Sequence, residues 1–89
     1  MNTISFKKLN DNARLPTKAH AGDAAFDLYS DTDQTLEPGE TKLISTGLQL
    51  ANFQSSRTAP DSIFMKIEGR SGLACKGIFP VGGIVDSSY

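Results

Sequence analysis

A guanidinium group, a hydroxyl group and two glycines stand together in the segment Gly69-Arg70-Ser71-Gly72. The arginine fork and the hydroxyl are donors that suit phosphate oxygens, and glycine lets a ligand come close to backbone amides. The segment is therefore a candidate binding site for a phosphate chain. A plain exposed turn explains the same four residues equally well, so both interpretations stay open.

A lone carboxylate, Asp86, follows a short apolar run that begins at Ile84, directly after the pair Gly82-Gly83. Two adjacent glycines favour a hairpin turn that exposes backbone donors and acceptors to a ligand. Asp86 could act on that ligand, or it could cap a turn, which is the commoner role of Asp at a strand end. Tyr89, further along, could contact the ligand or belong to the core.

A second carboxylate of interest, Asp27, lies between the apolar residues Phe26 and Leu28. Burying a carboxylate without a partner is costly, so an Asp in an apolar strand either has a partner or faces solvent. For Asp27 taken alone, a solvent-facing position on a strand is the favoured interpretation.

The elements that must position these groups are mostly β-strands, with one short helix. No window has sustained apolar spacing of the helical period, whereas several short runs alternate between apolar and polar residues. These runs are Ile4–Phe6, Lys42–Thr46 in part, Leu48–Leu50 and Ile63–Glu68. In the last run, Ile63, Met65 and Ile67 are predicted to share one face of a strand.

Turn residues separate these runs. Glu37–Glu40 predicts a hairpin turn, because its proline fixes φ and its glycine accepts a positive φ. Asn52–Ser62 is rich in polar residues and predicts an exposed loop. Ser71–Gly77 predicts a short helix, with its serine as the N-cap and Gly77 as its stop. Short strands at this spacing favour a small barrel or sandwich.

Composition narrows the classes of function. At 89 residues the chain is one small domain that buries a modest share of its surface, so further burial must come from elsewhere. Nine Lys and Arg against ten Asp and Glu give a net charge of −1, which predicts no broad basic face for a nucleic acid.

The setting of the protein is predicted to be cytoplasmic. The single cysteine, Cys75, allows no intrachain disulfide, which favours a reducing, intracellular compartment. No signal peptide follows Met1 and no apolar run reaches membrane-spanning length, so a soluble protein without a membrane partner is expected. His20 is predicted to be a solvated loop residue and Cys75 a small buried filler, so neither joins the candidate site.

In combination and in this order, three segments resemble the motifs of the dUTPase family. Residues 24–30 resemble the first motif, residues 69–76 the second and residues 83–89 the third. The resemblance implies an all-β fold, a jelly-roll-like β-barrel with one short helix, assembled as a homotrimer. Residues 1–89 are then interpreted as the N-terminal portion of one dUTPase-like domain, truncated at the C-terminus, with motifs four and five absent.

The resemblance implies an enzyme that hydrolyses dUTP to dUMP and pyrophosphate, which keeps uracil out of DNA. By analogy, Asp86 orients and activates the water that attacks the α-phosphorus, and it also holds the sugar 3′-hydroxyl. The backbone of Gly82, Gly83 and Ile84 reads uracil, and a site built for those hydrogen bonds rejects a mismatched base strongly. Tyr89 packs against the deoxyribose and excludes a 2′-hydroxyl.

The second and first motifs are implied to handle the triphosphate. Arg70 and Ser71 match residues that contact the phosphates and neutralise charge on the leaving pyrophosphate, while Gly72 leaves room for the chain. Asp27 matches an acid that supports Mg²⁺ through ordered water. Magnesium keeps much of its water shell, so sparse ligation by the protein is expected.

The chain departs from the family pattern in three places. Gly69 stands where many relatives have Pro, and Ser88 stands where many have a second acid, which removes a charge beside the site. The chain also stops before the fourth motif and the glycine-rich fifth motif. Residues 1–89 alone are therefore expected to be poorly active or inactive and prone to associate, with unpaired strand edges.

Two other functions remain open at this point. A dCTP deaminase shares the fold, but its second motif usually reads Arg-Ser-Ser and its reaction uses a later glutamate. This chain has Arg70-Ser71-Gly72, and no glutamate follows Glu68. A non-catalytic regulatory or remnant module of the same fold is the other alternative, since fold alone does not guarantee activity. The presence of Asp86 and Tyr89 argues against a decayed copy.

Overall fold

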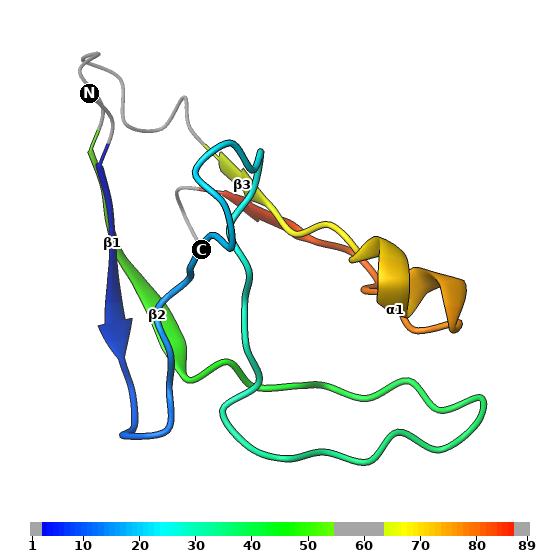
Figure 1. The fold of residues 1–89 in the computed structure, drawn as a ribbon. Helices are drawn as coiled ribbons and strands as arrows, with labels where there is room; N and C mark the ends of the chain where they lie inside the picture. Colours follow the sequence, from blue (N-terminus) through cyan, green and yellow to red (C-terminus); the bar gives the residue numbers. More distant parts are fainter. Residues whose placement is uncertain (1–2, 55–63, 87–89) are drawn as a thin grey trace. The chain divides into compact units, whose positions relative to one another are not determined.

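The computed structural model describes residues 3–54 and 64–86. They belong to two compact units, one of residues Ile4–Asn52 and one of Met1–Thr3 together with Phe53–Tyr89. The elements in chain order are β1 (Thr3–Lys8), β2 (Leu48–Gln54), β3 (Phe64–Lys66), α1 (Ser71–Cys75) and β4 (Ile84–Asp86) (Figure 1). The prediction of mostly strands with one short helix is confirmed.

The described strands form two separate two-stranded sheets, β1 with β2 and β3 with β4. The predicted strand runs Ile4–Phe6 and Leu48–Leu50 are confirmed as parts of β1 and β2. Leu48 and Leu50 are half-buried while Gln49 is exposed, as the alternation requires. Within residues 3–54 and 64–86 no closed barrel is present.

Hydrogen bonds join the segment that follows β1 to the segment that precedes β2. The amide of Leu9 donates to the carbonyl oxygen of Gly47 (2.7 Å), which extends the pairing of β1 with β2 by one step. One carboxylate oxygen of Asp31 accepts from Asn10 Nδ2 (2.9 Å) and from Ser45 Oγ (3.0 Å). Ala13, 3% exposed, is the buried hydrophobic residue among those described.

Gly47 has no room for a side chain. Its φ is +67°, and an added Cβ would lie 2.8 Å from Asn10 Nδ2, 2.9 Å from Ala13 Cβ and 2.9 Å from Asp31 Oδ2. We expect Gly47→Ala to lower the free energy of unfolding by about 3 kcal/mol, because backbone strain and steric overlap act together. Gly39→Ala is the matched control, since Gly39 has φ +76° but open space around it. The control is expected to cost about 1 kcal/mol, and equal urea midpoints for the two variants would contradict the prediction.

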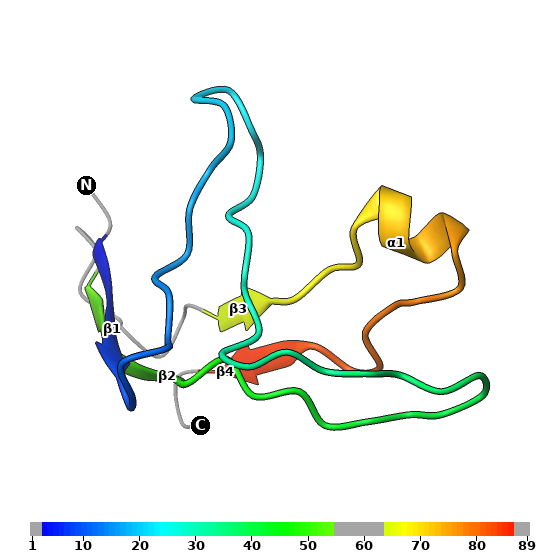
Figure 2. The same cartoon turned by 60° about the horizontal axis from the view of Figure 1, so that its bottom comes forward.

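The Pro38-Gly39 turn is confirmed, but one of the strands predicted beside it is absent. The amide of Glu40 donates to the carbonyl oxygen of Glu37 (2.9 Å), which closes the turn. Residues 41–47 carry no strand, so the prediction for Lys42–Thr46 is wrong. Figures 1 and 2 show two extended arms that run out to this turn, and Leu43 on one of them is 98% exposed. Alternating residues make a strand only where a neighbouring strand supplies a hydrogen-bonded ladder.

The loop predicted over Asn52–Ser62 is wrong at its start. β2 continues to Gln54, so the first residues of that range are strand. Residues 55–63 lie outside the described part of the chain.

The second sheet is a short antiparallel ladder. Phe64 pairs with Asp86, Met65 with Val85 and Lys66 with Ile84. The amide of Ile67 donates to the carbonyl oxygen of Gly83 (2.8 Å) and extends the pairing by one step.

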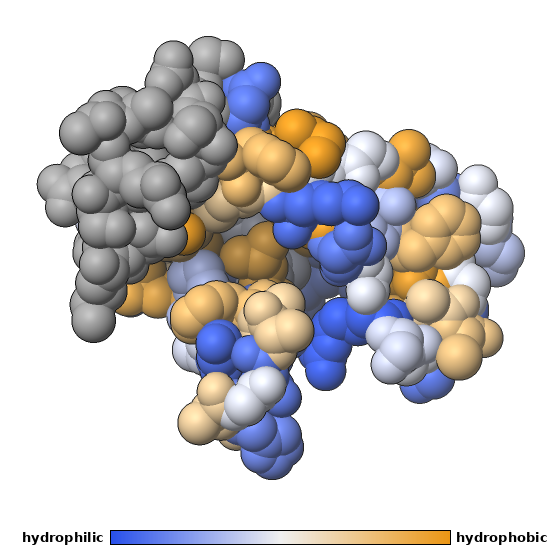
Figure 3. Space-filling model, turned by 90° about the horizontal axis from the view of Figure 1, so that it is seen from above, coloured by the Kyte–Doolittle hydropathy of each residue, from blue (hydrophilic) through white to orange (hydrophobic). Residues whose placement is uncertain are grey.

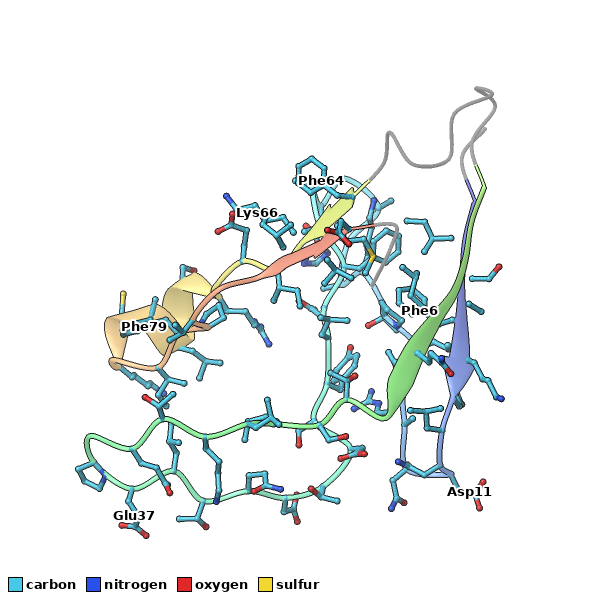
Figure 4. The ribbon with its side chains drawn as sticks, turned by 180° about the vertical axis from the view of Figure 1, so that it is seen from behind. Phe6, Asp11, Glu37, Phe64, Lys66 and Phe79 are labelled. Carbon is cyan, nitrogen blue, oxygen red and sulfur yellow. The ribbon has the colours of Figure 1, made fainter. Side chains whose placement is uncertain are left out.

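The two faces of this ladder differ in burial. Met65, Ile67 and Val85 are half-buried, whereas Phe64 and Lys66 are exposed and point to the same side of the strand (Figure 4). The predicted shared face of Met65 and Ile67 is confirmed, and Ile63, its third predicted member, lies outside the described residues.

Helix α1 begins and ends for identifiable reasons. Arg70, with φ −86° and ψ 135°, is the N-cap, and no side chain caps the helix, so the prediction that Ser71 is the cap is wrong. The extended backbone of the preceding segment continues through Arg70, whose carbonyl oxygen accepts the first helical bond, from Ala74 (2.8 Å).

The predicted stop of the helix is confirmed. Gly77 has φ +83°, its amide donates to Ala74 O (3.0 Å) and the amide of Ile78 donates to Leu73 O (2.9 Å). This is the Schellman arrangement that glycine favours after a helix.

Large apolar side chains reach the surface of both units, and Figure 3 shows them as orange atoms among polar ones. Phe26 is 61% exposed, Phe79 66% and Val81 79%. Such exposure agrees with the expectation that so short a chain buries little apolar surface by itself. Among the described residues no helix is long and apolar enough to span a bilayer.

Candidate functional site

Most of the predicted site residues lie in the segment that connects β3 to β4, residues 67–83. Arg70, Ser71 and Gly72 lie where the outgoing arm, residues 67–70, enters α1. Gly82 and Gly83 lie where the returning arm, residues 78–83, enters β4. The ladder therefore brings the candidate phosphate segment and the candidate uracil segment into one local structure, although many residues separate them in the sequence.

Gly83 fixes the point at which the returning arm meets the ladder. Its φ is +133°, and an added Cβ would lie 2.6 Å from the carbonyl oxygen of Ile67. No real Cβ makes so short a contact, so only glycine allows the two backbones to approach this closely. The backbone of Ile67 is thus a part of the site that the sequence analysis did not identify.

Gly82 plays a different part. Its φ is +83°, but nothing lies within 4 Å of an added Cβ. The two glycines together bend the chain into β4, which pairs with β3 and not with the residues just before the glycines. The predicted double-glycine hairpin is therefore wrong. The two glycines form a bend just before β4, because the partner of β4 is β3, which lies well before the glycines in the sequence.

Asp86 is the last described residue of β4 and lies opposite Phe64 in the ladder. Its side chain is exposed, as are those of Ile84 and Lys66 on the same face. Lys66 Nζ lies 2.8 Å from Glu68 Oε1. The hydrogen bond and the charge of Glu68 raise the pKa of Lys66 above its ordinary value, so this face carries a firmly protonated ammonium group near the strand end.

Arg70, Ser71 and Gly72 are all exposed. Among residues 3–54 and 64–86, the guanidinium of Arg70 forms no ion pair with another described residue. Nothing lies within 4 Å of a Cβ added at Gly72, which leaves the space beside the backbone that a phosphate chain needs. These features agree with an anion-binding segment.

Asp27 belongs to the other unit, Ile4–Asn52. It forms an isolated bridge with Thr17, in which the amide of Asp27 donates to Thr17 O (2.6 Å) and the amide of Thr17 donates to Asp27 O (3.3 Å). Asp27 is half-buried while Phe26 and Leu28 are exposed. Asp27 therefore lies on the more covered side of this stretch, and its half-burial leaves it partly open to solvent.

Tyr29 makes contacts with two residues near that bridge, Thr17 and Arg14. Its hydroxyl forms a hydrogen bond with Thr17 Oγ1, and the guanidinium carbon of Arg14 lies 3.9 Å from the ring centroid. Tyr29 is half-buried on the same side of the chain as Asp27.

The donor set offers little to a metal ion directly. Among residues 3–54 and 64–86, no three His, Cys, Asp or Glu side chains come together. A Mg²⁺ held chiefly by phosphate oxygens and water needs few protein ligands, and a single half-buried carboxylate such as Asp27 fits a water-mediated contact of that kind. Tyr89 and Ser88 lie outside the described residues.

Comparison with known proteins gives one consistent result. Residues 11–89 match the sequence profile of a protein family described as dUTPase. A protein named deoxyuridine 5′-triphosphate nucleotidohydrolase from Clostridioides difficile is 39% identical over 92 aligned residues, which cover 100% of this chain and 59% of that protein. Proteins of the same name from Vaccinia virus strain Copenhagen (38%, covering 97% of this chain and 54% of the relative) and from Trichodesmium erythraeum (37%, covering 97% and 58%) are similar as well. The chain spans between half and three fifths of the length of these relatives.

Proposed function

The chain belongs to the dUTPase family, and from this premise we propose that it contributes the nucleotide site of an enzyme that hydrolyses dUTP to dUMP and pyrophosphate. In this reaction the oxygen of a water molecule bonds to the α-phosphorus, and the bond to the oxygen bridging the α- and β-phosphorus breaks. The observation that carries the proposal is the β3–β4 ladder, which brings the segment of Arg70 and the segment of Asp86 into one structure.

Asp86 is assigned as the group that orients the attacking water and accepts its proton. Its support is its place at the exposed end of β4, in a register fixed by the pairing with Phe64. A carboxylate is ordinarily a weak base at neutral pH, so it is effective only when it is held against the water in a fixed position. The pairing of β3 with β4 supports the assignment, because it fixes the register of the Asp86 backbone.

Recognition of the nucleotide is assigned to the backbone around the glycine bend. Gly82, Gly83 and Ile84 read the edge of uracil through amide and carbonyl groups, and the close approach of Gly83 to Ile67 holds the bend in place. Tyr89 is assigned to the deoxyribose, where an aromatic ring leaves no space for a 2′-hydroxyl.

The triphosphate is assigned to the start of α1. Arg70 offers a planar pair of N–H donors, Ser71 a hydroxyl, and Gly72 an open backbone. These groups offset the negative charge that grows on the leaving pyrophosphate. Bound Mg²⁺ would neutralise further charge on the phosphates, with Asp27 supporting its water shell.

The barrel and the homotrimer expected of this family remain proposals for this chain. They are supported by the exposed apolar side chains of both units, since burial against further strands or further subunits would remove such side chains from water. The activity of the whole protein is likewise a proposal, because the chain spans only part of each relative.

The proposed function is tested by substrate choice. We expect the longest natural polypeptide that contains residues 1–89 to release pyrophosphate from dUTP in the presence of Mg²⁺, to act on dCTP at a rate lower by about 10⁴-fold, and to act on UTP more slowly than on dUTP because the 2′-hydroxyl meets the ring of Tyr89. Pyrophosphate release is measured for each nucleotide with Mg²⁺ and again with a chelator. Ammonia release from dCTP would favour the deaminase, and binding of dUTP without turnover would favour a regulatory module.

A further inference from the structure

Two cations lie over aromatic rings in the unit Ile4–Asn52. The guanidinium carbon of Arg14 lies 3.9 Å from the ring centroid of Tyr29. Nζ of Lys18 lies 4.7 Å from the ring centroid of Phe26. An exposed contact between a cation and a ring adds only modestly to stability, but it restricts where the cation lies.

The two pairs lie on opposite faces of the chain. Tyr29 is half-buried, as is Asp27, whereas Phe26 is 61% exposed. The backbone is extended at Asp27, where it forms an antiparallel bridge, so side chains there alternate between the two faces. Arg14 therefore belongs to the face of Asp27, and Lys18 belongs to the other face.

A series of contacts joins Arg14 to the backbone of Asp27. The ring of Tyr29, over which the guanidinium lies, forms a hydrogen bond through its hydroxyl with Thr17 Oγ1. The amide of Asp27 donates to Thr17 O (2.6 Å), and the amide of Thr17 donates to Asp27 O (3.3 Å). Contacts within one unit thus place the guanidinium relative to the position of Asp27.

This face offers a carboxylate and a guanidinium that form no ion pair with each other. Among residues 3–54 and 64–86, Arg14 forms no ion pair with another described residue. An arginine stacked on an aromatic ring still presents N–H donors in a fork that matches phosphate oxygens. The carboxylate of Asp27 suits the water shell of Mg²⁺, and the guanidinium suits the phosphate oxygens beside such an ion.

The proposed reaction decides which phosphates are available to this face. Asp86 is assigned to the water that attacks the α-phosphorus, so the α-phosphate must lie beside Asp86. The phosphates that remain for the face of Asp27 are the β- and γ-phosphates. This holds whichever subunit supplies Asp86, because Arg14 and Asp27 belong to one unit of one chain.

We propose that Arg14 is a further phosphate-binding residue, which contacts the β- and γ-phosphates of the nucleotide beside Asp27 and so favours a triphosphate over a monophosphate. The inference rests on the proposed function, which puts the magnesium-bound phosphates at Asp27. Thr17 and Tyr29 are positioning residues, and neither needs to touch the ligand.

The test compares two ligands in the longest natural polypeptide that contains residues 1–89. One is dUMP, which carries only the α-phosphate, and the other is a dUTP analogue with a non-hydrolysable α–β bridge. With Mg²⁺ present, we expect Arg14→Met to weaken binding of the analogue about tenfold and to leave the Kd of dUMP unchanged. Arg14→Lys keeps the charge without the planar fork, so it is expected to recover part of the loss. Isothermal titration calorimetry gives each Kd.

Lys18→Met is the matched control. It removes one positive charge and one contact with an aromatic ring from the same stretch of chain, but on the face away from Asp27, and it should change neither Kd. The unfolding temperature of every variant is measured together with its binding. An equal loss in Lys18→Met would overturn the inference, as would an Arg14→Met protein that is less stable but keeps the wild-type ratio of the two Kd values.

The outcomes also separate this inference from the proposed function. Wild-type protein that binds neither ligand would remove the proposed function and this inference with it. Wild-type protein that binds both would support the function. The inference alone would then fail if Arg14→Met bound the analogue as tightly as wild type does, or if it weakened both ligands equally.

Discussion

Replacing Asp86 by asparagine is expected to reduce kcat for dUTP hydrolysis by about 10²–10⁴-fold, the contribution that a well-placed general base makes. Asparagine has nearly the size and shape of aspartate and keeps one acceptor oxygen, but it cannot take a proton from water at neutral pH. Because the backbone of Asp86 pairs with that of Phe64 in β3 and the substitution leaves the backbone unchanged, the ladder should stay intact. Pyrophosphate release at saturating dUTP gives kcat directly, and the expected change in KM is small.

A second carboxylate on the same ladder provides the control. Glu68 is exposed and forms an ion pair with Lys66, but it has no assigned part in the reaction. Glu68→Gln should leave kcat close to the wild-type value and allow the pKa of Lys66 to fall back towards its ordinary value, since Glu68 is what raises it. Equal kcat in wild type and Asp86→Asn would remove Asp86 from the mechanism. If Glu68→Gln lowered kcat as much as Asp86→Asn does, the loss would come from the change in net charge and not from a general base.

The features that sequence analysis predicted correctly are those that neighbouring residues decide. The turn at Glu37–Glu40 follows from the φ of proline and the positive φ of glycine, and the end of α1 at Gly77 follows from the same freedom. The shared face of Met65 and Ile67 follows from the period of a strand. None of these depends on what lies elsewhere in the chain.

The features that failed depend on a distant partner. Lys42–Thr46 alternates like a strand, yet no strand forms there, because among the described residues the neighbouring arm supplies an isolated hydrogen bond, from the amide of Asp31 to the carbonyl oxygen of Ser45, and no ladder. β2 runs on through Asn52, a residue that local composition assigned to a loop, because pairing with β1 outweighs the weak strand preference of asparagine. Arg70 takes the N-cap position from Ser71 because the extended arm before the helix ends one residue earlier than expected.

The candidate site shows the same division. The motif resemblance supplied Arg70 and Asp86 as residue types in order, and the ladder then brought their segments into one unit. The contact of Gly83 with Ile67 could not be predicted, because a sequence shows that a side chain is missing but not which atoms fill its place. The half-burial of Asp27 could not be predicted for a related reason, since it accompanies the bridge to Thr17.

Gly83→Ala is expected to be the most damaging single change in the second unit, with a loss of about 3 kcal/mol or more in the free energy of unfolding. The added methyl group would lie 2.6 Å from the carbonyl oxygen of Ile67, and the φ of +133° is one that alanine rarely adopts. Relief requires the two backbones to separate, which breaks the hydrogen bond from Ile67 to Gly83. Urea unfolding followed by circular dichroism measures this loss.

Gly82→Ala separates the two causes, because Gly82 shares the positive φ, at +83°, but has open space around its Cβ. Its expected cost is about 1 kcal/mol, from backbone strain alone. The difference between the two variants therefore measures the close approach of the backbones at Gly83. If the two variants proved equally stable, the ladder would be free to widen at Gly83, and the register that places Asp86 opposite Phe64 would rest on the pairing of β3 with β4 alone.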